Sequence, residues 1–208
     1  MGELLVHVLY HNAKQKIKAN HLDYCNLNDL PFDPSLAENR FFLSDIHIQS
    51  EYIGIASASW NDKYPTSIKL ENLNDLSFEE SIVYAPDLSN KFWLLDSEKV
   101  HPGMFKILIL LSEKFNLDIS KSTLWANNFI CHKKVFKDFL SFWKEAYNFC
   151  IEEKLFNYHV GAENMHRHAA YLGERLTCLY FSSRKDLEIK STCNPPFIRS
   201  LHPVDLEP

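Results

Sequence analysis

Residues 4–10 read Leu-Leu-Val-His-Val-Leu-Tyr (LLVHVLY), a nearly continuous apolar run of strand length. A strand with apolar side chains on both faces is typical of the centre of an α/β sheet, where helices cover both sides. His11 and Asn12 end the run. The segment therefore predicts a central β-strand near the amino terminus.

The rest of the chain alternates strand-like and helix-like segments. Strands are expected at 52–60 (YIGIASASW) and 82–85 (IVYA), with extended chain at 123–131 and a loop at 21–34. Four helices are expected: one that starts at Ser35, and others at about 102–115, 135–150 and 169–181. Ser35 and Glu38 would form a capping box for the first helix, and Asp96 or Ser97 would cap the second. This order predicts an α/β fold with a mixed, mostly parallel central sheet flanked by helices on both faces.

The last residues differ in composition from the rest. The segment NPPFIRSLHPVDLEP is rich in proline and has no hydrophobic period. Such a segment is typical of a linker or a surface tail. We expect one domain over residues 1–192 and a tail or linker over 193–208, with further domains of the same polypeptide beyond it.

Composition excludes several functional classes. A net charge of −5 argues against general nucleic-acid binding, which depends on Lys and Arg neutralising phosphates. The five cysteines are widely spaced without a CxxC pair, which favours free thiols in a reducing compartment over a zinc ribbon. The amino-terminal run is too short for a signal peptide, and no run of 18 apolar residues exists. A cytoplasmic protein without a membrane span is expected.

Glycine is scarce, and this limits how phosphate can be bound. The five glycines are far apart, so neither GxGxxG nor a P-loop can be written. The chain also lacks GxSxG and HExxH. A bound diphosphate would need a divalent cation, polar side chains or both.

The segment after the second expected strand carries the strongest candidates. Ser57 and Ser59 belong to a strand end of small residues, which permits close approach of a ligand or of another backbone. Trp60 can stack on a flat ligand, and Asp62 can bind Mg²⁺ or Mn²⁺ through oxygen. A closely packed strand followed by a polar turn is the alternative.

Two more polar groups follow expected strands. Tyr10, His11 and Asn12 offer one ring face and two hydrogen-bonding tips, suitable for a nucleobase, or they form a turn. Asn127 and Asn128 can bind sugar hydroxyls, or they cap the following helix. Because ligands of open α/β sheets collect at the carboxyl ends of strands, the candidate segments are 10–12, 57–62, 86–87 and 127–128.

Glu174 is the candidate catalytic carboxylate. It lies within the last expected helix, flanked by apolar residues, so it either pairs with Arg167 or Arg175 or faces a cleft. The histidines before this helix, His159, His166 and His168, fit no standard zinc spacing.

A set of motifs in order resembles a known family. The motifs are Glu38 in an early helix, YIGI entering a strand end of small residues, IVYAPD (82–87), NNFICHKKVFKDFLSFW (127–143) and YLGERLTCLY (171–180). Together they resemble the bacterial capsular-polysaccharide glycosyltransferases of GT-A type. The length and the HVLYHN start are also similar to the amino-terminal glycosyltransferase domain of algal-virus enzymes that build capsid glycans.

The resemblance implies a GT-A fold, a UDP-sugar donor, a carbohydrate acceptor and Mn²⁺ or Mg²⁺. The bacterial family carries His-Tyr-Arg-Arg after the Tyr-Ile-Gly strand, where this chain has Ser57-Ala58-Ser59-Trp60. No Asp-x-Asp lies nearby, so Asp62 is the first candidate metal ligand and Asp87 the second.

These observations predict a metal-assisted glycosyltransferase that moves a hexose or deoxyhexose from a UDP-sugar to a carbohydrate hydroxyl. Tyr10, His11 and Asn12 would hold the nucleotide, Glu174 would act as base or electrostatic stabiliser, and Glu38 would contact donor or acceptor. For a viral chain the compartment would be the host cytoplasm. A nucleotide- or sugar-binding module without turnover is the alternative, and a plain interaction domain is a third reading.

Overall fold

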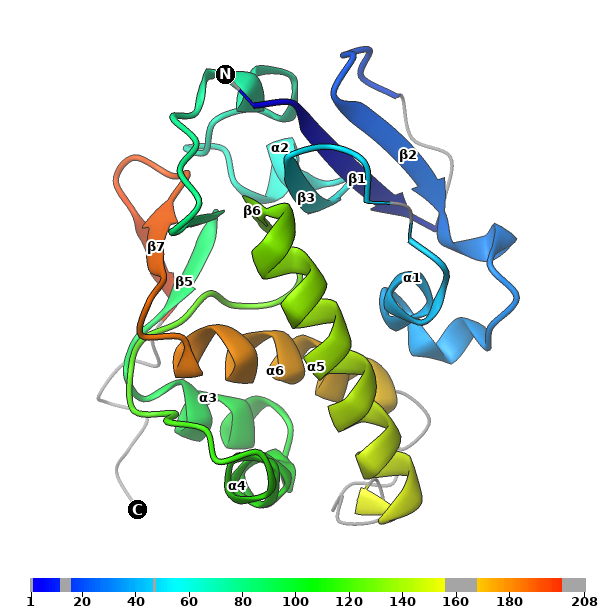
Figure 1. The fold of residues 1–208 in the computed structure, drawn as a ribbon, viewed down its shortest axis with the longest axis vertical. Helices are drawn as coiled ribbons and strands as arrows, with labels where there is room; N and C mark the ends of the chain where they lie inside the picture. Colours follow the sequence, from blue (N-terminus) through cyan, green and yellow to red (C-terminus); the bar gives the residue numbers. More distant parts are fainter. Residues whose placement is uncertain (1, 12–15, 47, 156–167, 200–208) are drawn as a thin grey trace.

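The computed structural model describes residues 2–11, 16–46, 48–155 and 168–199 (Figure 1). The described elements are β1 (Leu4–Tyr10), β2 (Leu22–Asn26), α1 (Asn39–Leu43), β3 (Tyr52–Ser57), α2 (Trp60–Lys63), β4 (Ile82–Ala85), β5 (Asp87–Ser89), α3 (Trp93–Val100), α4 (Met104–Lys114), β6 (Phe129–His132), α5 (Lys133–Glu152), α6 (His168–Ser183), β7 (Glu188–Ser191) and β8 (Phe197–Arg199). Three short 3-10 helices, η1 (Leu27–Asp29), η2 (Pro34–Leu36) and η3 (Leu70–Asp75), lie between them.

The main sheet is mixed and mostly parallel, as predicted. Its order is β2-β1-β3-β6-β4-β7, and β6 runs antiparallel to both of its neighbours. β1 lies between β2 and β3 and is parallel to both, so the expectation of a covered inner strand is confirmed. A separate parallel pair joins β5 to β8.

The two faces of the sheet carry two hydrophobic cores. On one face, alternate β1 residues such as Leu9 pack with α1, α4, α5 and α6. On the other face, Val6 and Val8 pack with Trp60 of α2 and with Leu70 and Leu73 of η3. Because successive side chains of a strand point to opposite faces, one apolar run contributes to both cores.

The expected loop at 21–34 is partly wrong, because it contains strand β2. This strand has the sequence LDYCN and pairs with β1 over its whole length. β2 is the edge strand of the sheet and none of its residues is fully buried. An edge strand needs no continuous apolar run, so the sequence signal is weak.

The expected capping box at Ser35 and Glu38 does not form. Asp33 accepts from the Ser35 amide at 2.8 Å and starts η2 instead. Ala37 then takes a positive φ of 48°, which interrupts the chain before α1 begins at Asn39. Glu38 precedes α1 without a capping side-chain bond, so its carboxylate is not used as a cap.

The expected helix at 102–115 is confirmed as α4, and a further helix, α3, precedes it. Gly103 has a φ of 92°, in the left-handed region that favours glycine, and separates α3 from α4. Glu98 caps α4 by accepting from the amides of Gly103 at 2.9 Å and Phe105 at 2.8 Å. Asp96 and Ser97, the expected caps, are buried inside α3.

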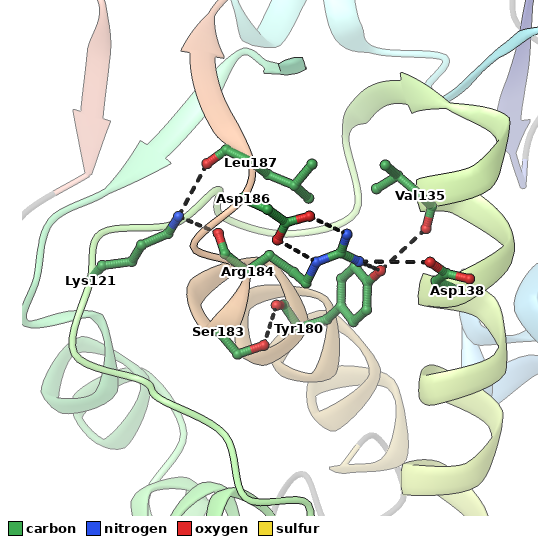
Figure 2. Close-up of polar contacts among 8 residues, drawn as sticks. All are labelled: Lys121, Val135, Asp138, Tyr180, Ser183, Arg184, Asp186 and Leu187. Carbon is green, nitrogen blue, oxygen red and sulfur yellow. Dashed lines mark hydrogen bonds and ion pairs between the residues drawn. The ribbon is translucent and has the colours of Figure 1, made fainter. Parts of the chain in front are cut away.

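Helices α5 and α6 form where the three- and four-residue periods predicted them, and both cover the same face of the sheet (Figure 1). The carboxyl end of α6 is fixed by a polar cluster, shown in Figure 2, in which Arg184 contacts Asp186 and Asp138 while Lys121 reaches two main-chain carbonyls.

Within the expected tail, Phe197–Arg199 forms β8. No helix among the described residues has the length and apolarity needed to cross a membrane.

Candidate functional site

Three strand ends meet at one edge of the sheet and form a small cavity. β1 and β3 are parallel, so their carboxyl ends lie together, with Leu9 beside Ser57. β6 runs the opposite way, so the segment that precedes it reaches the same edge. The cavity is lined by Leu9, Glu38, Ala56, Ser57, Lys63, Ala126, Asn127, Asn128 and Glu174. The fold therefore brings together five of the site residues predicted from the sequence, although they are spread over more than 130 positions of the chain: Glu38, Ser57, Asn127, Asn128 and Glu174.

Asn127 and Asn128 connect the cavity to the sheet and to α6. The Asn128 side-chain oxygen accepts from the Ser57 amide at 2.8 Å, and the Asn127 side-chain oxygen accepts from the Thr177 hydroxyl at 2.6 Å. Neither residue caps a helix, because His132 caps α5. The Asn127 amide nitrogen is buried and has no acceptor among the described residues. Buried donors in proteins normally have an acceptor, and a water or a ligand oxygen would supply one here.

Glu174 both pairs with an arginine and faces a cavity, the two alternatives that the sequence left open. Its carboxylate accepts from the Arg175 guanidinium at 3.2 Å, and it also lines the cavity with its side chain 28% exposed. Arg175 is fully buried and lies 3.7 Å from the centre of the Trp125 ring. Arg167, the other expected partner, lies outside the described residues.

Next to Glu174, the buried Arg175 guanidinium packs against Cys178 and the Trp125 ring. Burial raises the pKa of the Cys178 thiol, which accepts from Arg175 at 3.5 Å. The guanidinium is thus held between a thiol, a ring face and the Glu174 carboxylate. This packing fixes the position of Arg175 and supplies positive charge next to Glu174.

Arg40 belongs to the same region and was not found by sequence reasoning. It is 1% exposed and donates to the His11 ring nitrogen Nδ1 at 3.2 Å, so Nδ1 is an acceptor and Nε2 carries the proton of a neutral ring. His11 itself is exposed at the end of β1. Its place two residues after Glu38 is the one sequence signal that could have pointed to it.

Two aromatic candidates do not face the cavity. Tyr10 lies on the opposite face of β1, with its ring 6.4 Å from that of Tyr24 and the Lys16 ammonium 5.2 Å from its centre. Trp60 is fully buried, and its indole nitrogen donates to the Ile68 carbonyl at 2.9 Å. The expectation that Trp60 stacks on a ligand is wrong for this arrangement, since its ring belongs to the core.

The remaining polar candidates are near the edge or away from it. Ser59 contacts the hydroxyl of Ser57 at 2.8 Å and so joins the cavity indirectly. Asp62 is exposed on α2, one residue before the cavity residue Lys63. Asp87 is fully buried in β5 and does not line the cavity. Asn12, His159 and His166 lie outside the described residues, as does the side chain of His168.

The cavity is much smaller than a nucleotide sugar. Its free volume is about 30 Å³, which is enough for one water molecule. Among the described residues no three His, Cys, Asp or Glu side chains form a metal-binding group.

Comparisons with known proteins support the fold. No known family profile and no curated protein sequence matches the chain. Among solved structures, the apo structure of the bifunctional glycosyltransferase WbbM is similar, with a TM-score of 0.55 at 12% sequence identity. The match covers 91% of this chain and 44% of WbbM, so the chain spans less than half the length of that protein. The chain thus has a glycosyltransferase-like α/β fold.

Proposed function

We propose that the chain is a glycosyltransferase that moves a hexose or deoxyhexose from a UDP-sugar to a carbohydrate hydroxyl, assisted by Mn²⁺ or Mg²⁺. One observation carries the proposal. Within a glycosyltransferase-like fold, Glu38, Ser57, Asn127, Asn128 and Glu174 converge on one cavity at the sheet edge. Open α/β sheets bind their ligands at such edges.

Each group has a chemical role in this proposal. The buried Asn127 amide donates to a sugar hydroxyl, and the Ser57 and Ser59 hydroxyls extend that polar surface. Glu174 lies in the cavity as base for the acceptor hydroxyl or as electrostatic stabiliser. His11 and Asn12, which follow β1, would contact the nucleotide, whereas Tyr10 faces away from the cavity and is not retained. Lys63 lines the cavity and would lie near the diphosphate.

The donor set is compatible with a divalent cation. Mg²⁺ is commonly held by one or two carboxylates together with substrate phosphates. Glu38 and Glu174 line the same cavity. Asp62 is exposed one residue before Lys63, which also lines it, and we keep Asp62 as the proposed protein ligand. Asp87 is fully enclosed and is not retained. The cation would neutralise the diphosphate leaving group.

The proposal also covers the polypeptide and the compartment in which the chain works. The chain matches 44% of WbbM, and we propose that it works as one transferase unit of a longer polypeptide in the cytoplasm, as the resemblance to algal-virus capsid-glycan enzymes implies. A non-catalytic module that binds a nucleotide or sugar is the second candidate. The absence of an Asp-x-Asp near the strand end of small residues favours it.

Calorimetry with a panel of nucleotide sugars, with and without Mn²⁺, tests the proposal. We expect metal-dependent binding of one UDP-sugar and slow hydrolysis of it. Glu174→Gln should lower hydrolysis by about 10²-fold or more while donor affinity changes little. Glu152→Gln, at an exposed site on α5, is the matched control.

The metal ligand is tested separately. Asp62→Ala should abolish the effect of Mn²⁺ on donor binding, whereas Asp75→Asn, exposed in η3, should not. An unchanged metal titration in Asp62→Ala rejects that residue. Donor binding without hydrolysis or transfer would establish the module, and no binding to any donor would leave only an interaction domain.

A further inference from the structure

A buried arginine contacts the exposed histidine that follows β1. Arg40 of α1 is 1% exposed and comes two residues after Glu38, which lines the edge cavity. His11 comes two residues after Leu9, another lining residue, and two residues of extended chain span about 7 Å. The contact between Arg40 and His11 therefore lies beside the edge cavity.

This contact decides which hydrogen bond His11 can make. The Arg40 guanidinium donates to the ring nitrogen Nδ1 at 3.2 Å. A guanidinium has no acceptor, so Nδ1 must accept, and the proton of the ring is on Nε2. Among the described residues no group accepts from Nε2, and the Asn28 side-chain amide holds the His11 main chain by donating to its carbonyl. The exposed ring thus offers an N–H donor to a ligand.

The positive charge of Arg40 is not balanced by a carboxylate within the described part of the chain. Its Nε donates to the Ala37 carbonyl at 3.3 Å, and its other partner is the neutral His11 ring. A buried cation without an ion-pair partner is costly to a fold and leaves a positive potential around it. An anion bound on the exposed side of His11 would reduce that cost.

We propose that Arg40 is a positioning residue for the nucleotide of the donor. It leaves His11 with Nε2–H as donor to an oxygen of a nucleoside diphosphate, and its charge favours an anionic ligand there. Arg40 does not touch the ligand, because it is enclosed, and acts through His11. The inference rests on the proposed function, since it assigns the hydrogen bond by which His11 contacts the nucleotide.

Nitrogen NMR of the His11 imidazole in the unmodified chain tests the geometry without a ligand. At about pH 8, above the usual titration range of histidine, Nδ1 should give the signal of an unprotonated nitrogen and Nε2 that of a protonated one. His11→Gln identifies the two signals by their loss. Addition of UDP with Mg²⁺ should shift the Nε2 signal more than the Nδ1 signal. A proton on Nδ1 would overturn the proposal, because Arg40 could not then donate to it.

Calorimetry with UDP tests whether Arg40 acts through His11. Arg40→Met and His11→Ala should each weaken UDP affinity about tenfold, the loss of one hydrogen bond to a charged ligand. The double variant should lose no more than either single variant, because both changes remove the same contact. Arg40→Lys, which keeps a donor and the charge, should recover part of the affinity. Lys137→Met, which removes a positive charge from an exposed position on α5, is the control.

The outcomes separate this inference from the proposed function. Additive losses in the double variant, or equal UDP affinity in all variants, would overturn the role of Arg40 and leave nucleotide binding intact. If the unmodified chain binds no nucleotide, the proposed function fails and the role of Arg40 fails with it. Urea denaturation shows whether Arg40→Met is folded, and the NMR measurement on the unmodified chain decides the geometry if it is not.

Two fragments of the nucleotide locate the oxygen that His11 contacts. Uridine carries the base carbonyls, and inorganic pyrophosphate carries the phosphate oxygens. His11→Ala should weaken binding of the fragment that supplies the acceptor and leave the other unchanged. An unchanged affinity for both fragments and for UDP would contradict the proposed hydrogen bond.

Discussion

At the scale of single residues, Asn127 holds the candidate site together. Its side-chain oxygen accepts from Thr177 of α6, and its side-chain nitrogen remains available at the cavity. One side chain thus links the segment before β6 to the helix that carries Glu174. The sequence suggested Asn127 as a sugar-binding residue but gave no indication of Thr177, because a threonine inside a helix is ordinary.

Replacing Thr177 by valine should test this link. The substitution preserves shape but removes the donor, and it leaves the buried Asn127 oxygen without a partner. We expect a loss of about 1 to 3 kcal/mol in the free energy of unfolding, measured by urea denaturation. Thr66→Val, at an exposed position, should cost much less. Equal effects of the two variants would show that the bond contributes nothing.

Trp60 shows why a residue type alone misleads. An exposed tryptophan at a strand end can bind a ligand face, but this one begins α2, where its ring meets Tyr64 at 5.9 Å and its nitrogen is bonded to a carbonyl. Whether the ring points outward depends on where α2 turns back onto the sheet. That direction is a tertiary property.

At the scale of elements, α1 and α6 touch at Gly173. A Cβ atom at this position would overlap the side-chain amide of Asn39, the first residue of α1. Asn39 is 1% exposed and donates to the Ala169 carbonyl at 2.5 Å, so it cannot easily move away. Glycine is therefore required for the close approach of two helices that each bring a carboxylate to the site.

Gly173→Ala should destabilise the fold although alanine is the better helix former. Helix propensity favours the change by about 1 kcal/mol, but overpacking against Asn39 should cost about 1 to 3 kcal/mol. Thermal unfolding should show a lower midpoint for Gly173→Ala than for the unmodified chain. In an Asn39→Ala background the same substitution should be neutral or stabilising. Additive losses in the double variant would contradict the proposed contact.

The carboxyl end of α6 depends on Arg184, as Figure 2 shows. Arg184 donates to both oxygens of Asp186, at 2.8 and 2.6 Å, and lies 3.9 Å from Asp138 of α5. It also contacts the Tyr180 hydroxyl. These bonds lower the pKa of the Asp186 carboxyl, with the Arg184 hydrogen bond as the main cause. The cluster joins α6 to α5 and to the turn before β7.

Asp186→Asn should therefore have a pH-dependent effect. Because the pKa is lower in the folded than in the unfolded chain, the ionised carboxylate stabilises the fold above the unfolded pKa of about 3.9, and this contribution is lost as the pH falls through the folded pKa. Asp186 is largely exposed, so about 1 kcal/mol or less is expected at pH 7. Urea denaturation should show the difference at pH 7 and a smaller one near pH 3. A difference that grows on acidification would contradict this sign.

At the scale of the whole molecule, the reaction rates of the cysteine thiols measure how readily the fold opens. All five are free, and Cys25 on the edge strand β2 is the only one that is not buried. Burial raises the pKa of the thiols of Cys131, Cys150 and Cys178, that of Cys150 to about 12. Both effects slow reaction with thiol reagents, which attack through the thiolate.

Labelling of the native chain should therefore show one fast thiol and four slow ones. Cys25→Ser should remove the fast phase, while the slow phase should follow global unfolding and accelerate with urea in step with loss of structure. Fast labelling of more than one thiol in the native chain would show that the core opens locally. Mass spectrometry after brief exposure to the reagent distinguishes these outcomes.

The sequence by itself determined the elements in which apolar residues form a continuous run or recur at helical spacing. The run at 4–10 and the helices α5 and α6 formed as expected because their burial patterns follow from local repeats of apolar residues. It also placed Ser57, Asn127 and Asn128 among the candidate site residues because they lie near expected strands, Glu174 because of its place in the last expected helix, and Glu38 through the family resemblance. The ligand roles of these residues stay predictions.

Only the tertiary structure decided which candidates meet. It brought Glu38 and Glu174 to one cavity, buried Trp60 and Asp87, paired Glu174 with Arg175, and added Arg40 as a partner of His11. It also revealed β2, whose half-buried edge position requires no apolar run. The physical reason is the same in each case: packing between distant segments fixes the direction of a side chain, and that direction has no local signature in sequence.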